Sequence, residues 1–298
     1  MTFPTACDRL PKMVSGRRSA VRSEVSGVLI FGAHPDDADF SAGGVAALFA
    51  ECGCRVKLVS LTNGDAGHFE MGGAPLAWRR RREAAASGTV LGCEYVTLDT
   101  HDGELLPTLE LRREVIGLIR EFKPDVVMTP RPWDYHPDHR YTAQVVQDAL
   151  YMVTVPNVVS RAPHLDANPV VLYVHDGFQR PYPFVADVVA DIGSVVERKV
   201  DALHCHTSQV YEWLPYNRGE LDTVPLGEDD RRAWLRQTLE PRLRRAADLY
   251  RDRLIALYGD VHGSEVVYAE AFEICEYGAP LADADIPRLF PFFNGFGG

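Results

Sequence analysis

The chain has 298 residues, of which 46% are hydrophobic and 24% are charged, and its formal net charge is −11 at pH 7. These proportions are typical of a globular protein and exclude a disordered or coiled-coil chain. The acidic excess argues against a nucleic-acid partner, because such binding depends on basic residues that displace counterions from phosphates.

Residues 1–24 form a polar leader. Its arginines, Arg17, Arg18 and Arg22, are not followed by the apolar stretch of a secretory signal. No segment has the roughly 20 consecutive apolar residues that a membrane-spanning helix needs. We therefore expect a cytoplasmic protein with no membrane span, in which residues 25–298 form a single domain.

Strands and helices alternate along the first half of the sequence. Short apolar runs rich in β-branched residues predict strands, and apolar residues at helical spacing predict helices. The strands are expected at Val25–Gly32, Arg55–Leu61, Tyr95–Leu98 and Asp125–Thr129, and the helices at Ser41–Cys52, Leu76–Leu91 and Leu109–Phe122. This alternation predicts an α/β, Rossmann-like fold, which is a mostly parallel sheet with helices on both faces.

The second half has weaker patterns. The expected elements are a helix to about Tyr151, a strand at Val170–Val174, a helix at Ser194–His206, a long helix at Glu228–Tyr258 and a strand at Val266–Ile274. Residues 211–227 mix Pro, Gly, Asn and aromatic residues and predict a long loop. From its length and composition we expect this loop to be a lid that sets substrate preference.

Functional side chains are expected directly after the first and fourth strands. In such a sheet these strands are neighbours where the strand order reverses, and ligands bind beyond their carboxyl ends. The segment Ala33–Asp37 follows the first strand and reads Ala-His-Pro-Asp-Asp, with Gly43 and Gly44 in the next helix. The fourth strand is followed by His136–His139, which reads His-Pro-Asp-His. Histidine and carboxylate are the ligands of catalytic zinc, whereas either turn alone is typical of a helix cap.

Together the two motifs resemble those of the LmbE-like (PIG-L) family of metal-dependent sugar N-deacetylases. That family combines Ala-His-Pro-Asp-Asp and paired glycines with a later His-Pro-Asp-His segment. Further matches extend the resemblance over most of the chain: Thr62–Gly67, Arg80 with Glu83, Asp102-Gly103 and His206–Gln209.

The resemblance implies roles for individual residues. It makes His34, Asp37 and His139 the ligands of Zn²⁺, with Fe²⁺ as the alternative metal. It makes Asp36 the general base and His136 the electrophile or general acid, held by Asp138. It also implies substrate contacts for Arg80, Asp102 and His206. Each of these three has a structural alternative: a solvated run of arginines, an Asp-Gly turn and a helix cap, respectively.

The implied reaction is hydrolysis of an N-acyl amide, in this family N-acetyl, on a small molecule that contains an amino sugar. A single-metal amidase of a thiol or antibiotic conjugate is an alternative. A phosphoesterase would need a second metal with bridging carboxylates. A non-catalytic Rossmann-like module is disfavoured, because Asp36 and Asp37 would repel a pyrophosphate. The apolar segment Leu289–Phe293 is expected to dock on the core or on a second subunit of a homo-oligomer.

Overall fold

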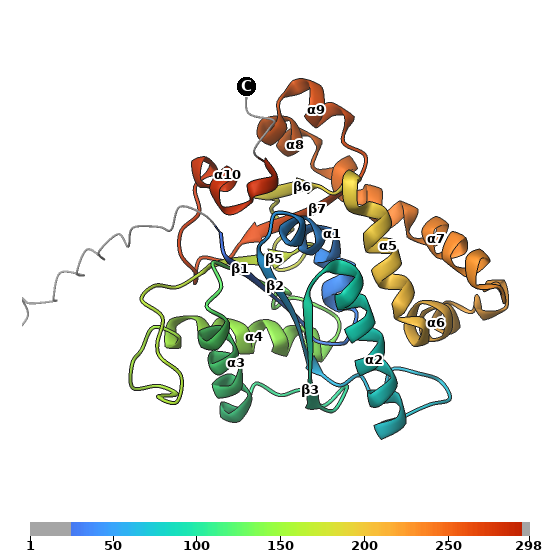
Figure 1. Cartoon of the computed structure of the whole chain (residues 1–298), viewed down its shortest axis with the longest axis horizontal. Coiled ribbons are helices and arrows are strands. Elements are labelled where there is room, and N and C mark those ends of the chain that lie inside the picture. Colours follow the sequence, from blue (N-terminus) through green and yellow to red (C-terminus); the bar gives the residue numbers. More distant parts are fainter. Residues whose placement is uncertain (1–24, 294–298) are drawn as a thin grey trace, which may run out of the picture.

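The computed structural model describes residues 25–293, and its strands form one seven-stranded sheet (Figure 1). The strands are β1 (Gly27–Gly32), β2 (Arg55–Thr62), β3 (Glu94–Thr100), β4 (Val126–Thr129), β5 (Val170–Val174), β6 (Val188–Asp191) and β7 (Ala269–Ile274). Their order is β3-β2-β1-β4-β5-β7-β6. Neighbours from β3 to β5 pair in parallel, and β7 runs antiparallel to β5 and β6. The predicted mostly parallel α/β sheet is confirmed.

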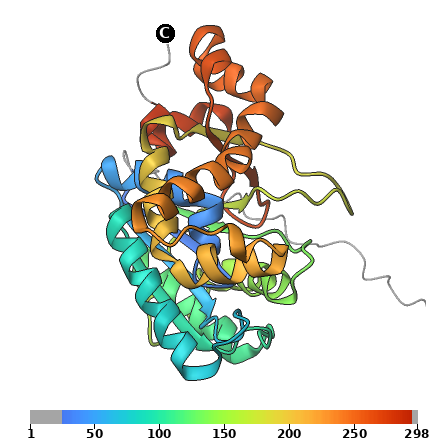
Figure 2. The same cartoon turned by 90° about the vertical axis from the view of Figure 1, so that its right-hand side faces the viewer.

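Helices cover both faces of this sheet. They are α1 (Asp37–Glu51), α2 (Gly73–Leu91), α3 (Leu109–Phe122), α4 (Pro137–Met152), α5 (Val196–Cys205), α6 (Leu214–Arg218), α7 (Glu228–Leu249), α8 (Arg251–Tyr258), α9 (Asp260–Glu265) and α10 (Ile286–Leu289). Helices α3 and α4 pack on one face, and α1 and α7 pack on the other. Helix α2 lies beside α5 (Figure 2).

Strand β1 shows how the sheet is buried on both sides. Val28 and Ile30 belong to the hydrophobic cluster on the α1 side, and Leu29 and Phe31 belong to the cluster on the side of α3 and α4. All four side chains are almost completely inaccessible to solvent. Alternation of this kind is what a central parallel strand requires, because both of its faces meet helices.

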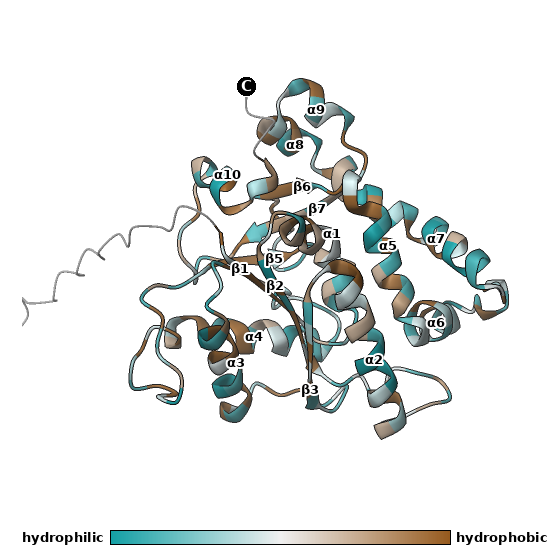
Figure 3. Cartoon of the chain, in the orientation of Figure 1, coloured by the Kyte–Doolittle hydropathy of each residue, from teal (hydrophilic) through white to brown (hydrophobic). Residues whose placement is uncertain are grey.

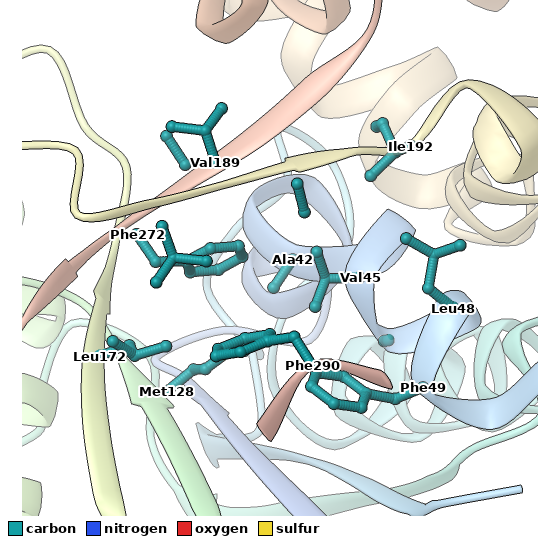
Figure 4. Packing of buried hydrophobic residues seen from close by; sticks show 14 of the residues in the cluster. Ala42, Val45, Leu48, Phe49, Met128, Leu172, Val189, Ile192, Phe272 and Phe290 are labelled. Carbon is teal, nitrogen blue, oxygen red and sulfur yellow. The ribbon is translucent and has the colours of Figure 1, made fainter. Parts of the chain in front are cut away.

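Helix α1 packs through Ala42, Val45 and Phe49 against the sheet and the C-terminal segment (Figure 4). The ring of Phe290 lies 5.5 Å from that of Phe49, centroid to centroid, and Phe290 is fully buried. The segment Leu289–Phe293 therefore docks on the core of its own chain, which is the first of its two predicted positions.

The predicted elements differ from the structure mainly in the second half. The long helix breaks at Tyr250, whose φ of −118° and ψ of 34° are not helical, and it divides into α7 and α8. Helix α7 is largely hydrophilic (Figure 3) and contains Pro241. The segment 211–227 is irregular only in its second half: a π-helical turn at Gln209–Trp213 leads directly into α6, and residues 219–227 contain only a short 3-10 turn at Leu221–Thr223. Strand β6 and the short helices α9 and α10 were not predicted.

Within residues 25–293, no helix combines the length and the apolarity needed to cross a bilayer. The predicted polar leader at residues 1–24 lies outside the described residues.

Candidate active site

The two predicted motifs meet at one edge of the sheet. Strand β1 pairs with β2 on one side and with β4 on the other, so the strand order reverses between β1 and β4. The carboxyl ends of β1 and β4 therefore point into the same region, and the segments that follow them face each other. The two motifs therefore lie at neighbouring strand ends, as the sequence predicted.

The turn after β1 is tight and strained. The backbone N–H groups of Asp36 and Asp37 both donate to the carbonyl oxygen of His34, at 2.9 and 3.2 Å. Asp36 has a φ of 151°, a conformation that non-glycine residues rarely adopt and that is concentrated at functional sites. Gly32 is required here, because a Cβ at that position would lie 2.8 Å from the Cβ of Asp37. The turn folds Asp37 back, so that its Oδ2 accepts from the backbone N–H of His34 at 2.7 Å.

Three donor atoms form an almost equilateral triangle. The Nδ1 of His34, the Oδ2 of Asp37 and the Nε2 of His139 each lie 3.3 Å from the other two. Tetrahedral zinc with ligand bonds of about 2.0–2.1 Å places its ligand atoms about 3.3–3.4 Å apart. The donor set and its spacing therefore fit one divalent metal ion, as the sequence motifs predicted.

Each histidine of the triangle has a carboxylate behind it. The Nε2 of His34 lies 3.2 Å from Asp138 and 3.1 Å from Asp102. The Nδ1 of His139 lies 3.1 Å from Asp134. These contacts assign the ring protons to the atoms that face the carboxylates and leave the other nitrogens free for a metal, an arrangement typical of metal-binding histidines. Asp134 was not among the predicted site residues, although the need for a carboxylate beside each histidine ligand and its place just before His136 could have indicated this role.

His136 lies close to the triangle but is arranged differently. It is the N-cap of α4, and its Nδ1 accepts from the backbone N–H of Asp138 at 3.2 Å. Its ring contacts that of His34 edge-on at 4.7 Å, and the nitrogens of His34, His136 and His139 lie within 4.8 Å of one another. The shorter contacts of Asp37 favour it over His136 as the third ligand.

Asp36 and Arg80 form a buried pair beside the triangle. Arg80 is 2% exposed and donates to Asp36 at 3.1 Å, to the Pro35 carbonyl at 3.0 Å and to the Gly64 carbonyl at 3.3 Å. Burial raises the pKa of Asp36 to about 6, although the charge of Arg80 opposes this shift. Arg80 thus stabilises the turn after β1, and it is not part of a solvated helix face.

The other two predicted substrate contacts have different environments. Asp102 lies at the site, with its Oδ1 against His34 and its Oδ2 3.8 Å from Arg80. His206 is completely buried, and its Nε2 lies 3.3 Å from the carboxylate of Asp39. The structure therefore leaves His206 no surface for direct contact with a substrate, which corrects its predicted role: the helix end that carries it turns into the core.

A cavity of about 470 Å³ opens onto the triangle. Asp36, Asp37 and His139 form part of its wall. Leu214 and Arg218 also line it, so the segment 211–227, predicted as a lid, borders the cavity. Closure of this segment over a substrate stays a prediction.

Aromatic rings stack near the same edge. The ring of Tyr216 is stacked on Phe69 at 4.4 Å and lies parallel to Trp213 at 5.9 Å. A Cβ at Gly67 would lie 3.8 Å from the Nε1 of Trp213 and 3.1 Å from Asp102, which places Trp213 close to the site. Flat rings beside polar side chains are suited to contact with a sugar.

Fold and site together define an α/β enzyme with a histidine and carboxylate metal-binding group. Comparison with known proteins extends this assignment. The model of the PIG-L family, described as GlcNAc-PI de-N-acetylase, matches residues 29–150. Diacetylchitobiose deacetylase of Thermococcus kodakarensis is 33% identical over 213 residues, which cover 66% of this chain and 76% of that protein.

Two further relatives are similar over comparable lengths. A 4-oxalmesaconate hydratase of Pseudomonas putida is 27% identical over 199 residues, covering 64% of this chain and 76% of that protein. The structure of N,N'-diacetylchitobiose deacetylase from Pyrococcus horikoshii, in complex with an inhibitor, superposes with a TM-score of 0.64 at 25% identity and covers 85% of each chain. This chain belongs to the LmbE-like (PIG-L) family, and it is an enzyme of the N-deacetylase class, which hydrolyses amide bonds.

Proposed function

We propose that this enzyme is a zinc-dependent deacetylase that releases acetate from an N-acetyl group on an amino sugar within a small molecule. The observation that supports it best is the triangle of His34, Asp37 and His139, with the carboxylate of Asp36 next to it in the chain. The names of the two deacetylase relatives support the sugar substrate. Ferrous iron is the alternative metal, because histidine and carboxylate ligands also suit it.

The chain's own side chains have separate tasks in this proposal. A zinc ion held by the triangle would polarise the amide carbonyl and lower the pKa of water. Asp36 takes the proton of the attacking water, and Arg80 fixes its orientation. The Nδ1 of His136 already accepts a backbone hydrogen bond, so its Nε2 carries the proton. From there His136 donates a hydrogen bond to the carbonyl oxygen as negative charge develops on it. The proton that Asp36 took from water then passes to the departing amine.

The substrate would bind between the metal site and the aromatic stack. Trp213 and Tyr216 offer ring faces to the sugar, and Asp102 offers carboxylate oxygens to its hydroxyl groups. Replacement of Trp213 by Ala should raise KM for a disaccharide substrate and leave the metal content unchanged. An unchanged KM would remove the aromatic platform from the proposal.

The decisive experiment measures free amine and acetate from N-acetylglucosamine and N,N'-diacetylchitobiose, with zinc-loaded and ferrous enzyme. Elemental analysis should give one metal ion per chain. A chelator should abolish the release, and added metal should restore it. Equal release by the chelated enzyme would refute the metal-dependent mechanism, and two metals per chain would favour the phosphoesterase alternative.

A second candidate function follows from the hydratase relative at 27% identity. A hydratase adds water to a carbon–carbon double bond and releases no amine. Offering 4-oxalmesaconate under the same conditions distinguishes the two reactions, because water addition removes the ultraviolet absorbance of the conjugated substrate. Loss of absorbance without amine release from any acetylated sugar would favour the hydratase.

A further inference from the structure

Helix α7 presents one face to the cavity beside the metal site. Leu235, Thr238, Leu239 and Arg242 all line this cavity. Their spacing along the helix is that of a single face. Arg242 therefore shares one cavity with Asp37 and His139.

Arg242 differs from the other arginines of the cavity wall. The guanidinium of Arg131 lies 2.6 Å from Asp176, and that of Arg218 lies 2.6 Å from Glu220. Among residues 25–293, Arg242 makes neither a hydrogen bond nor an ion pair, and its guanidinium carbon lies over the ring of Phe40 at 4.8 Å. Stacking on a ring uses the flat face of the guanidinium, which leaves its N–H edges available.

A second cavity of about 440 Å³ adjoins the first, and Arg242 lines both. Arg245 lines the second cavity, and within the described part of the chain it also lacks an ion pair. The lysine and the glutamate of this cavity, Lys199 and Glu270, pair with each other at 2.5 Å, and Asp176 is engaged by Arg131. Among the charged side chains of the second cavity, Arg242 and Arg245 are therefore the ones that no ion pair neutralises within residues 25–293.

His175 lies at the same junction and responds to this charge. It follows β5 directly and lines both cavities. Burial lowers the pKa of His175 to about 4; Asp176 opposes this shift, and the charges of Arg245, Arg242 and Arg131 add to it. Three guanidinium groups thus act on one point of the cavity wall.

We propose that the cavity beside the metal site contains a subsite for an anionic substituent of the substrate, a carboxylate or a phosphate, which Arg242 binds with support from Arg245. Both groups present paired oxygens that match the forked N–H donors of a guanidinium. The inference rests on the proposed function, and it narrows the substrate to an N-acetyl amino sugar that bears a negative charge away from the acetyl group.

Arg244 provides the matched control. It lies on the same helix, its guanidinium is 3.3 Å from Glu240, and it lines neither cavity. Arg242→Gln and Arg244→Gln therefore remove the same charge from the same helix, but only the first removes it from the cavity. Both side chains are exposed, so both variants are expected to fold like the parent.

The test compares neutral N-acetylglucosamine with N-acetylglucosamine 6-phosphate and with N-acetylmuramic acid, which carry a phosphate and a carboxylate respectively. The parent enzyme should have a lower KM for at least one anionic sugar. Arg242→Gln should raise that KM about tenfold or more with little change in kcat. A charge-assisted hydrogen bond remote from the reacting bond stabilises the bound substrate and the transition state equally, so its loss affects binding and not the chemical step. Arg242→Lys should show a smaller loss, and Arg244→Gln should match the parent. The anionic sugar whose KM rises in Arg242→Gln shows whether the subsite binds a phosphate or a carboxylate.

Calorimetric binding of the same three sugars to the metal-loaded protein separates the two proposals. Tighter binding of an anionic sugar that Arg242→Gln abolishes supports the subsite, even if no amine is released and the deacetylase proposal fails. Equal affinity for neutral and anionic sugars, or equal losses in Arg242→Gln and Arg244→Gln, would overturn the subsite whether or not deacetylation occurs.

Discussion

The Nε2 atom of His34 lies 3.2 Å from the Oδ2 atom of Asp138, and this contact joins the two motifs behind the metal-binding triangle. Asp138 is fully buried and also accepts the backbone N–H of Gly103 at 2.7 Å. The resemblance predicted that Asp138 holds His136. In the structure the backbone N–H of Asp138 donates to His136, whereas the Asp138 carboxylate holds His34.

Asp138→Asn should therefore weaken metal binding more than it weakens the fold. The amide keeps the size of the carboxylate but removes the negative charge that orients His34 and makes it a better ligand. Loss of such a partner typically costs about 10–100-fold in metal affinity or activity. Competition with a fluorescent chelator measures the affinity, and Asp148→Asn is the control, since Asp148 is on the same helix 3.7 Å from Arg112. Equal affinities in the two variants would contradict the role of Asp138.

Asp36→Asn should retain the metal and lose the reaction. Asparagine tolerates positive φ better than most residues, so the strained turn is expected to persist. Removal of a general base lowers the rate by roughly 10²–10⁴-fold. Elemental analysis should find the parental metal content, and single-turnover assays with an acetylated sugar measure the chemical step. Turnover at the parental rate would show that another group takes the proton.

The position of the site could be predicted because its signals are local. A buried apolar run followed at once by His34, Asp36 and Asp37 needs no knowledge of distant residues, and the parallel fold then brings the end of β4 alongside. The partner of each side chain could not be predicted in this way. Whether the Asp138 carboxylate contacts His34 or His136 depends on the exact path of two segments that are far apart in the sequence.

Helical spacing distinguishes Arg80 from the other arginines of its run on α2, although the composition of the run does not. The run Arg79–Arg82 is typical of a solvated surface, but helical spacing places Arg80 on the same face as Leu76 and Glu83, and all three are buried. Likewise, Pro215 contributed to the prediction of a loop, although it occupies the first turn of α6, where proline is favourable.

Arg80→Met should destabilise the protein strongly. The substitution leaves the buried Asp36 carboxylate and two carbonyl groups without their donor, and breaking a buried pair in this way costs about 3–5 kcal/mol. For a chain of this size we expect the melting temperature to fall by at least about 6 °C. Arg82→Met is the control, because the exposed Arg82 guanidinium lies over the Trp78 ring at 4.6 Å. Similar melting temperatures for both variants would show that Arg80 is not required for the turn.

His175 should make the protein less stable in acid. Its pKa is lowered from 6.5 to about 4 by burial, with Arg245 and Arg242 adding to the effect and Asp176 opposing it. Between these two values the unfolded chain binds a proton that the folded chain does not, so the free energy of unfolding falls as the pH decreases through this window. Above pH 6.5 His175 is neutral in both the folded and the unfolded chain, so this loss of stability is absent there.

His175→Gln removes this titration while keeping a polar side chain against Phe184 and Tyr250. Between pH 7 and pH 5 the parent should lose about 1–2 kcal/mol more stability than the variant, since each unit of pKa difference corresponds to about 1.4 kcal/mol. Urea unfolding of the metal-loaded parent and variant at pH 7 and pH 5 measures the loss of stability of each protein. Titratable groups that both proteins share cancel when the two losses are compared. Equal losses of stability in the parent and in His175→Gln would mean that His175 binds its proton equally well in the folded and unfolded chains. The junction of the two cavities would then be more hydrated than its burial indicates.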